Sequence, residues 1–282
     1  MKNVVITGAS TGIGYDAARY LIERGYHVFG SVRKQADADR VQSELGEQFT
    51  PLLFDVTDGA AVETAVSQVA AKVGQAGLAG LVNNAGIAVA GPLMHLPLDE
   101  LRQQFEVNLF GLLDVTQKFL PMLGAVPNAS HSPGRIVNIS SVSGKIVYPF
   151  MGPYAASKHA LEALSDALRR ELLIFGVDVI VIEPGSVQTP IWDKAQELDT
   201  SQYSHTAYKS IMDGMKRVFV NQGKTGIPVE KVSETIYAAL TKENPKTRYV
   251  LARKLLTNWL LPRYLPDRRF DKIIAKRLGI AK

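Results

Sequence analysis

Short apolar runs, rich in β-branched residues, alternate along the chain with longer stretches whose apolar residues recur every three or four positions. The stretch 154–175 shows the second pattern at Ala160, Leu164 and Leu168. Because these two periods belong to strands and helices respectively, the chain should alternate between them. The predicted strands are 3–7, 26–32, 50–55, 79–83, 135–140, 177–183 and 246–251, and the predicted helices are 13–24, 36–45, 59–73, 97–123, 154–175 and 229–241.

This alternation predicts an α/β fold with a doubly wound parallel sheet and helices on both faces, because parallel neighbours require crossover connections. We find neither an internal repeat nor a linker, so one domain is expected. Residues 1–252 should form the catalytic part, including a substrate loop near 190–228 that extends beyond a strand end. Residues 253–282 form a basic C-terminal extension that we expect to pack on the same domain.

Composition narrows the class of protein. The chain is 46% apolar and 21% charged, which excludes disorder and allows a large core. It has no cysteine, so disulfides, thiolate metal sites and a cysteine nucleophile are excluded. With no signal peptide and no apolar run of about 18 residues, we expect a soluble, cytoplasmic protein.

Positive charge is concentrated at the C-terminal end. Residues 246–282 carry 11 basic and 2 acidic residues, whereas residues 1–245 carry 21 basic and 25 acidic residues. A uniformly basic protein would suggest nucleic acid, but this distribution does not, so no nucleic-acid partner is expected. The tail mixes leucines with the positive charges. Packing on its own domain is the favoured interpretation, and a pocket cap or a peripheral contact with an anionic membrane are the alternatives.

A glycine-rich turn follows the first predicted strand, where residues 3–14 read NVVITGASTGIG. A turn of this kind brings backbone N–H groups and the positive end of a helix dipole to a diphosphate, and glycine permits the close approach. A tight turn without a ligand would look similar. The strand, turn and helix context nevertheless favours a dinucleotide site.

The spacing Gly-x-x-x-Gly-x-Gly resembles that of the short-chain dehydrogenase/reductase family. Four further motifs of that family follow in order over residues 3–190: Asn-Asn-Ala-Gly at 83–86, Asn108, Tyr-x-x-x-Lys at 154–158 and Pro-Gly followed by Thr at 184–189. The resemblance implies a Rossmann-type fold and an oxidoreductase, similar to hydroxysteroid and retinol dehydrogenases. It implies cofactor contacts from Gly8, Ser10, Thr11, Gly12, Ile13, Gly14, Asn83, Ala85, Gly86, Pro184, Gly185, Val187 and Thr189.

The second predicted strand ends at Arg33, where an NAD-binding protein would have an acidic residue for the ribose 2′-hydroxyl. An arginine pairs instead with a 2′-phosphate, and we expect no acidic neighbour to compete for it. We therefore predict NADP(H), with a solvated strand-end charge as the alternative. Asp55 and Val56 resemble the pair that contacts the adenine in this family, although an Asp at a strand end is also an ordinary helix cap.

Tyr154 and Lys158 are four positions apart on a predicted helix and so share one face. An ammonium at about 4 Å would lower the pKa of the phenol by up to roughly three units, which brings it into range for proton transfer. Ser141 follows the strand at 135–140 and should lie at the carboxyl edge of the sheet. By resemblance, Ser141 and Tyr154 contact the substrate oxygen, Tyr154 and Lys158 also contact the cofactor, and Asn108 completes the catalytic set through a water.

We therefore expect hydride transfer between NADP(H) and a small hydrophobic ketone or secondary alcohol. The segments expected to line the pocket, 93–94, 147–150 and 191–192, are apolar and aromatic, although simple packing explains them equally well. No histidine has metal-ligand spacing, so no metal is expected. The rival interpretations are a non-catalytic NADP(H) sensor and an isomerase or dehydratase on this fold. The resemblance also implies a homodimer or homotetramer through the helices at 97–123 and 154–175.

Overall fold

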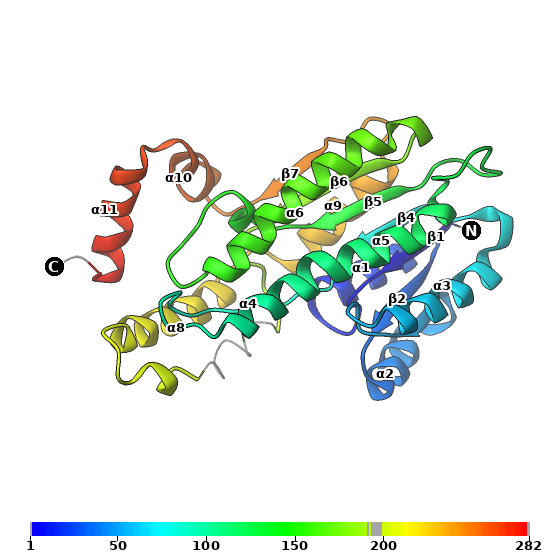
Figure 1. Ribbon diagram of the computed structural model, residues 1–282. Coiled ribbons are helices and arrows are strands. Elements are labelled where there is room, and N and C mark those ends of the chain that lie inside the picture. The colour runs from blue at the N-terminus through cyan, green and yellow to red at the C-terminus, as the bar shows by residue number, and fades with distance from the viewer. Residues whose placement is uncertain (1, 191, 193–198, 281–282) are drawn as a thin grey trace.

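A parallel sheet of seven strands forms the centre of the described chain (Figure 1). The computed structural model describes residues 2–190, 192 and 199–280, with 218–220, 222 and 224 described by their backbone alone. The strand order is β3-β2-β1-β4-β5-β6-β7. The strands are β1 (Lys2–Ile6), β2 (Tyr26–Val32), β3 (Phe49–Leu53), β4 (Gly80–Asn83), β5 (Arg135–Ile139), β6 (Asp178–Pro184) and β7 (Arg248–Leu251).

Every predicted strand is present within two residues of its expected ends. The apolar runs form strands because helices cover the sheet on both sides, and every residue of β2, for example, is buried. The chain adds β2 and β3 on one side of β1 and then crosses to place β4 on its other side. The gap between the loops that follow β1 and β4 is therefore the position where ligands bind in sheets of this kind.

The helices divide between the two faces of the sheet, as predicted. Residues of α1 and α9 lie in one buried cluster, and residues of α3, α5 and α6 lie in the other. The helices are α1 (Gly12–Ile22), α2 (Gln35–Leu45), α3 (Gly59–Val73), α4 (Leu98–Phe105), α5 (Leu112–Phe119), α6 (Gly152–Glu171), α8 (Lys209–Lys224), α9 (Val229–Thr241), α10 (Leu261–Tyr264) and α11 (Asp267–Leu278).

The helix predicted over 97–123 is interrupted. Helix α4 ends at Phe105, a π-helical turn spans Glu106–Gly111, and α5 begins at Leu112. The wider turn contains the buried Asn108, whose side chain bonds both backbone groups of Ile87. The prediction assumed one α-helix with 3.6 residues per turn over 97–123, and it therefore missed this wider turn.

Helices α8, α10 and α11 form where the sequence indicated a polar loop and a tail. Helix α8 lies in the region 190–228, and Met212 and Met215 on it join a buried cluster with Phe150 and Tyr203. Leu278, at the end of α11, packs against this cluster. Figure 1 shows α10 and α11 at the end of the molecule opposite α2 and α3. Among the described residues, no helix is both long and apolar enough to cross a bilayer.

Helix α9 is fastened to α1 by a buried hydrogen bond, in which Oγ of Ser233 donates to Oδ2 of Asp16 over 2.6 Å. We expect Ser233→Ala to lower the free energy of unfolding by about 1–3 kcal/mol, because it removes a donor from a buried carboxylate. Urea denaturation measures this change. Thr235→Ala is the matched control, since its hydroxyl bonds the backbone of its own helix, and it should change stability by less than about 0.5 kcal/mol. Equal effects of the two variants would contradict the prediction.

Candidate active site

Three positions in and just after the turn between β1 and α1 favour or require glycine. Gly8 and Gly12 have φ values of +68° and +59°, which favour glycine, and a Cβ on Gly14 would lie 2.2 Å from the Gly8 carbonyl oxygen. Thr11 is the N-cap of α1, and no side chain caps the helix start by a hydrogen bond. The N–H groups there are available to an anion, so Ser10, Thr11, Gly12, Ile13 and Gly14 fit the diphosphate of a dinucleotide.

The loop after β4 is held against this turn by Asn84, a residue that the sequence motif contained but that was not singled out. Its Nδ2 donates to the carbonyl oxygens of Thr7 and Gly8 over 2.9 and 3.0 Å. The Thr7 hydroxyl in turn accepts from N of Asn84 and of Ala85. Asn83 points elsewhere, because its Nδ2 donates to Thr116 and Asn138 inside the sheet.

The segment after β6 lies over the glycine turn. A Cβ on Gly12 would come within 3.4 Å of Cβ of Thr189, and the Gly185 N–H donates to the end of β7 at Leu251. Val187 accepts from the Trp192 indole over 2.7 Å. Three of the expected cofactor segments, at 8–14, 83–86 and 184–189, therefore meet at one place. Ile191, which we expected beside Trp192 in the pocket, lies outside the described residues.

Arg33 and Asp55 end neighbouring strands and are brought together, with Nη1 of Arg33 3.7 Å from Oδ2 of Asp55. The expectation that Arg33 has no acidic neighbour was therefore wrong. Both side chains are substantially exposed, so this long ion pair contributes little and leaves the guanidinium accessible. A second arginine, Arg40 on α2, donates to the Ser10 carbonyl oxygen over 2.7 Å and was not identified from the sequence. Val56 is buried behind Asp55, against Gly111.

Ser141, Tyr154 and Lys158 meet at the carboxyl end of β5. Nζ of Lys158 donates to the Ile139 carbonyl oxygen over 2.8 Å and lies 5.8 Å from the centre of the Tyr154 ring. Ser141 and Lys158 are buried, with 7% and 6% of their surface exposed, and the Ser141 side chain is hydrogen-bonded to the phenol. The proposed catalytic hydroxyls and ammonium therefore share one enclosed space.

The pKa of Tyr154 differs from the prediction. Burial raises the pKa of this phenol, and the hydrogen bond with Ser141 opposes the rise only in part. The predicted lowering by Lys158 was wrong for this structure, because desolvation disfavours the phenolate and the ammonium is engaged by the Ile139 carbonyl. Tyr154 is consequently a protonated phenol at neutral pH.

Asn108 is connected to helix α6 through Ser157. Its Oδ1 accepts from the Ile87 N–H, and its Nδ2 donates to the Ile87 carbonyl oxygen and to Oγ of Ser157 over 3.2 Å. Ser157 bonds in turn to the Tyr154 carbonyl oxygen over 2.8 Å. The amide thus couples the loop after β4 to the helix turn that carries Tyr154 and Lys158.

A buried charge cluster behind Lys158 was not identified from the sequence. Glu162 lies one helical turn beyond Lys158 and pairs with Arg248 at 2.9 Å and Lys145 at 3.2 Å. Burial lowers the pKa of Lys158 to about 8, and the negative charge of Glu162 opposes this shift. Burial, together with Glu162, raises the pKa of the neighbouring Glu183 to about 7. The spacing of Glu162 from Lys158 and the charge at Glu183 within an apolar strand were the available sequence signals.

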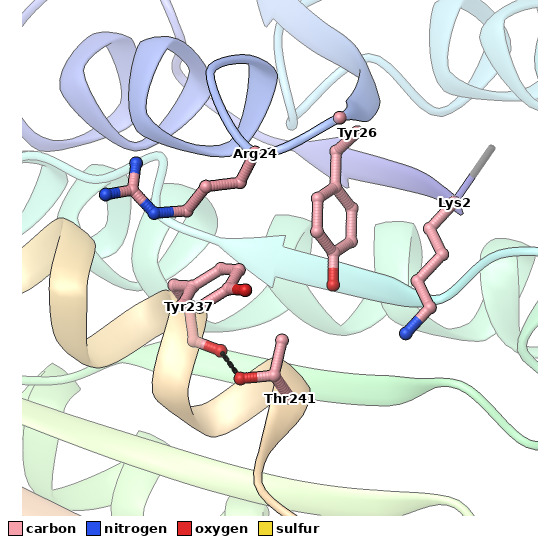
Figure 2. A pocket seen from close by; sticks show the side chains of 6 residues that line it. Lys2, Arg24, Tyr26, Tyr237 and Thr241 are labelled. Carbon is pink, nitrogen blue, oxygen red and sulfur yellow. Dashed lines mark hydrogen bonds between the residues drawn. The ribbon is translucent and has the colours of Figure 1, made fainter.

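An open hollow elsewhere on the surface is not part of this site. Figure 2 shows it around Lys2, Arg24, Tyr26 and Tyr237. Lys2 and Tyr26 begin β1 and β2, so the hollow lies at the amino edge of the sheet, whereas the catalytic candidates lie at the carboxyl edge. In the part of the chain that the structure describes, no group of three or more His, Cys, Asp or Glu side chains could hold a metal ion.

Residues 2–199 match the family model described as short chain dehydrogenase, and the chain belongs to this family. It is an oxidoreductase, as the motifs indicated. A protein from Ornithobacterium rhinotracheale called NADPH-dependent 3-dehydrocapnine reductase is 44% identical over 99% of this chain and 98% of its own length. The uncharacterized oxidoreductase YbbO of Escherichia coli is 37% identical over 97% of this chain and 94% of its own length.

A solved structure has the same fold over the whole chain. The crystal structure of a short-chain dehydrogenase from Streptomyces avermitilis is similar with a TM-score of 0.76 and 26% identity, covering 99% of this chain and 97% of that one. The predicted Rossmann-type sheet with helices on both faces is confirmed by this likeness and by the strand order.

The negative charge of Glu162 should sustain the ammonium of Lys158. Burial lowers the pKa of Lys158, and the charge of Glu162 partly offsets this effect. Glu162→Gln should therefore lower the pKa of Lys158 further below about 8. The fraction of ammonium at neutral pH then falls. Nuclear magnetic resonance titration of isotopically labelled lysine side chains measures the shift.

Asp166→Asn provides the control, because Asp166 also pairs with Arg248 but does not contribute to the shift at Lys158. It should leave the Lys158 titration in place. A Lys158 pKa that stays constant or rises in Glu162→Gln would contradict this electrostatic role.

Proposed function

We propose that this oxidoreductase reduces a hydrophobic ketone with NADPH, using Ser141, Tyr154, Lys158 and Asn108. The cofactor is NADP(H), supported by Arg33 at the end of β2 and by the NADPH dependence named for the Ornithobacterium protein. The observation that carries the proposal is the convergence of Ser141, Tyr154 and Lys158 at the carboxyl edge of the sheet, the edge that also carries the glycine-rich turn.

The bound nicotinamide would supply the hydride, and the protein supplies position and the proton. Ser141 and Tyr154 hydrogen-bond the substrate oxygen, where negative charge develops during reduction. Tyr154 carries the proton to be donated, and because burial raises its pKa, the phenol gives up this proton only as negative charge develops on the substrate oxygen. Lys158 lies beside the phenol, and its bond to the Ile139 carbonyl oxygen holds the ammonium at this end of the site. Asn108 orders the adjoining turn of α6 for proton return.

The substrate side is apolar. Leu93 packs beside Gly152 at the start of α6, and Leu93, Met94 and Val147 are exposed around this end of the sheet. Such side chains favour a hydrophobic ketone over a charged metabolite. Because one relative at 44% identity is called a 3-dehydrocapnine reductase, 3-dehydrocapnine belongs in the panel of test substrates, next to steroid and retinoid ketones or aldehydes.

The proposal is tested by measuring NADPH oxidation with each substrate of this panel. The reaction is monitored as the loss of nicotinamide absorbance. Tyr154→Phe should reduce kcat by roughly 10²–10⁴-fold because it removes the proton donor, while the Kd for NADPH changes by less than about threefold. Tyr237→Phe, the same chemical change at the far hollow, should keep full turnover. Full activity of Tyr154→Phe would refute the catalytic assignment. NADPH binding without turnover of any substrate would favour the sensor.

Cofactor choice should depend on Arg33. Arg33→Asp should lower kcat/KM for NADPH by roughly 10–100-fold and raise the relative use of NADH, because it replaces a phosphate partner by a carboxylate. Lys34→Asp, an equal charge change at the next position, is the control and should retain the preference for NADPH. The assignment of Arg33 is wrong if its substitution leaves the ratio of the two kcat/KM values unchanged.

We further infer a cytoplasmic homodimer or homotetramer. The support for association is an exposed apolar surface on the segment 97–123, where Leu101, Phe105 and Phe110 line a shallow hollow. Phe110 is more than half exposed in the single chain. A second copy of the chain that covers this surface would remove its apolar side chains from water, which favours association.

A further inference from the structure

The C-terminal tail presents an exposed surface that the proposed reaction does not use. Apolar side chains along it face solvent, including Leu256 at 62%, Tyr264 at 73% and Ile273 at 53% exposure. Leu255, Leu260 and Leu261 are exposed as well. Exposed apolar side chains gathered on one short segment mark an interaction site more often than single ones do.

Helix α11 is sided. Phe270, Ile274 and Leu278, spaced four apart, lie on its inner face, where Ile274 is buried and the other two are partly buried. Arg268, Arg269, Lys272 and Lys276 are exposed and project on the other side at helical spacing. No salt bridge joins these four cations to a carboxylate within the described residues. The outward face of α11 is therefore cationic, with Ile273 at its margin.

The same helix borders the active-site mouth. The Phe270 ring meets the Tyr148 ring edge-on, with centres 6.1 Å apart, and Tyr148 lies in the segment between Ser141 and Tyr154. Leu278 packs on the cluster that contains Phe150 and Tyr203. Phe150 accepts a backbone hydrogen bond from Gly91, next to the exposed Leu93 and Met94. The tail and the apolar rim of the site thus form a connected region.

We infer that this tail surface, defined by Leu256, Leu260, Leu261, Tyr264 and the cations of α11, docks on an anionic lipid bilayer. Leucine and tyrosine side chains enter the interfacial layer while lysine and arginine meet lipid phosphates, which is the composition of interfacial helices. Docking would place the mouth of the site at the bilayer, where a hydrophobic ketone resides. Only this last step rests on the proposed function.

The charge and the apolar side chains of the tail surface favour an anionic bilayer as its partner over a second copy of the chain or a nucleic acid. A second copy of the same surface would bring like charges face to face, since residues 246–282 carry 11 basic and 2 acidic residues. A nucleic acid would use the cations but would leave the exposed leucines without a partner. An anionic bilayer satisfies both groups of side chains.

Sedimentation with vesicles tests the inference on the full chain. We expect binding to vesicles of mixed phosphatidylcholine and phosphatidylglycerol, weak binding to pure phosphatidylcholine, and weakening as salt increases. The double variant Lys272→Glu/Lys276→Glu should lose at least about tenfold in vesicle affinity, since each cation near the surface contributes to it. Leu256→Ser/Tyr264→Ser should also weaken binding, because it removes insertion. All four side chains are exposed, so folding should persist, which thermal unfolding checks.

Lys2→Glu/Lys242→Glu is the matched control, with the same change of net charge at the amino edge of the sheet. It should retain nearly all of the vesicle binding. The inference is overturned if the unmodified chain does not sediment with anionic vesicles, or if either tail variant binds them as well as the control does. Tight binding to duplex DNA that is indifferent to Leu256→Ser/Tyr264→Ser would overturn it in favour of a nucleic-acid surface.

Light scattering of the same variants tests the remaining alternative, in which a second copy of the chain binds the tail surface. A fall in oligomer mass in the tail variants, without vesicle binding by the unmodified chain, would overturn the inference and assign the surface to self-association. Because sedimentation does not depend on turnover, a chain that binds vesicles but reduces no ketone would contradict the proposed function alone. A chain that reduces ketones but ignores vesicles would contradict the inference alone.

Discussion

The hydrogen bond from Lys158 to the Ile139 carbonyl oxygen fixes helix α6 against the end of β5. A buried ammonium needs a partner, because desolvation otherwise makes its charged form costly. The Ile139 carbonyl lies at the last residue of the strand, two positions before Ser141. Satisfying Lys158 therefore also sets the distance between the strand end and the start of α6. Tyr154, one turn earlier on the helix, is consequently placed beside Ser141.

Much of the fold and several parts of the site could be predicted from local pattern. Inner strands such as β5 and β6 are β-branched runs buried on both faces, so their positions are visible in the sequence without any knowledge of packing. The glycine turn is similarly local, because the positive φ values at Gly8 and Gly12 select glycine directly. Helix α8 was not predicted because its apolar residues, such as Met212 and Met215, are interspersed with polar ones in a region that is polar as a whole. They are buried only because Phe150 and Tyr203 come to them from distant segments.

The electrostatic predictions failed where they depended on burial or on register. Spacing placed Tyr154 and Lys158 on one face but could not say how far each group is removed from water, and burial decides the direction of the Tyr154 pKa. Arg33 and Asp55 are 22 residues apart, and only the pairing of β2 with β3 brings them together. Glu162 and Arg248 likewise meet because β7 lies next to β6. Contacts of this kind are set by the sheet and are invisible to a local pattern.

The π-helical turn at Glu106–Gly111 rotates the side chains of α4 about the helix axis relative to those of α5. One extra residue in a turn advances the helix by about 100°. The chain can therefore keep Val115 and Phe119 in the core while Phe105, at the end of α4, is partly exposed and Phe110, in the π-helical turn itself, is exposed. The bulge thus lets the outer helix surface take an orientation of its own while the amide of Asn108 stays bonded to Ile87 in the interior.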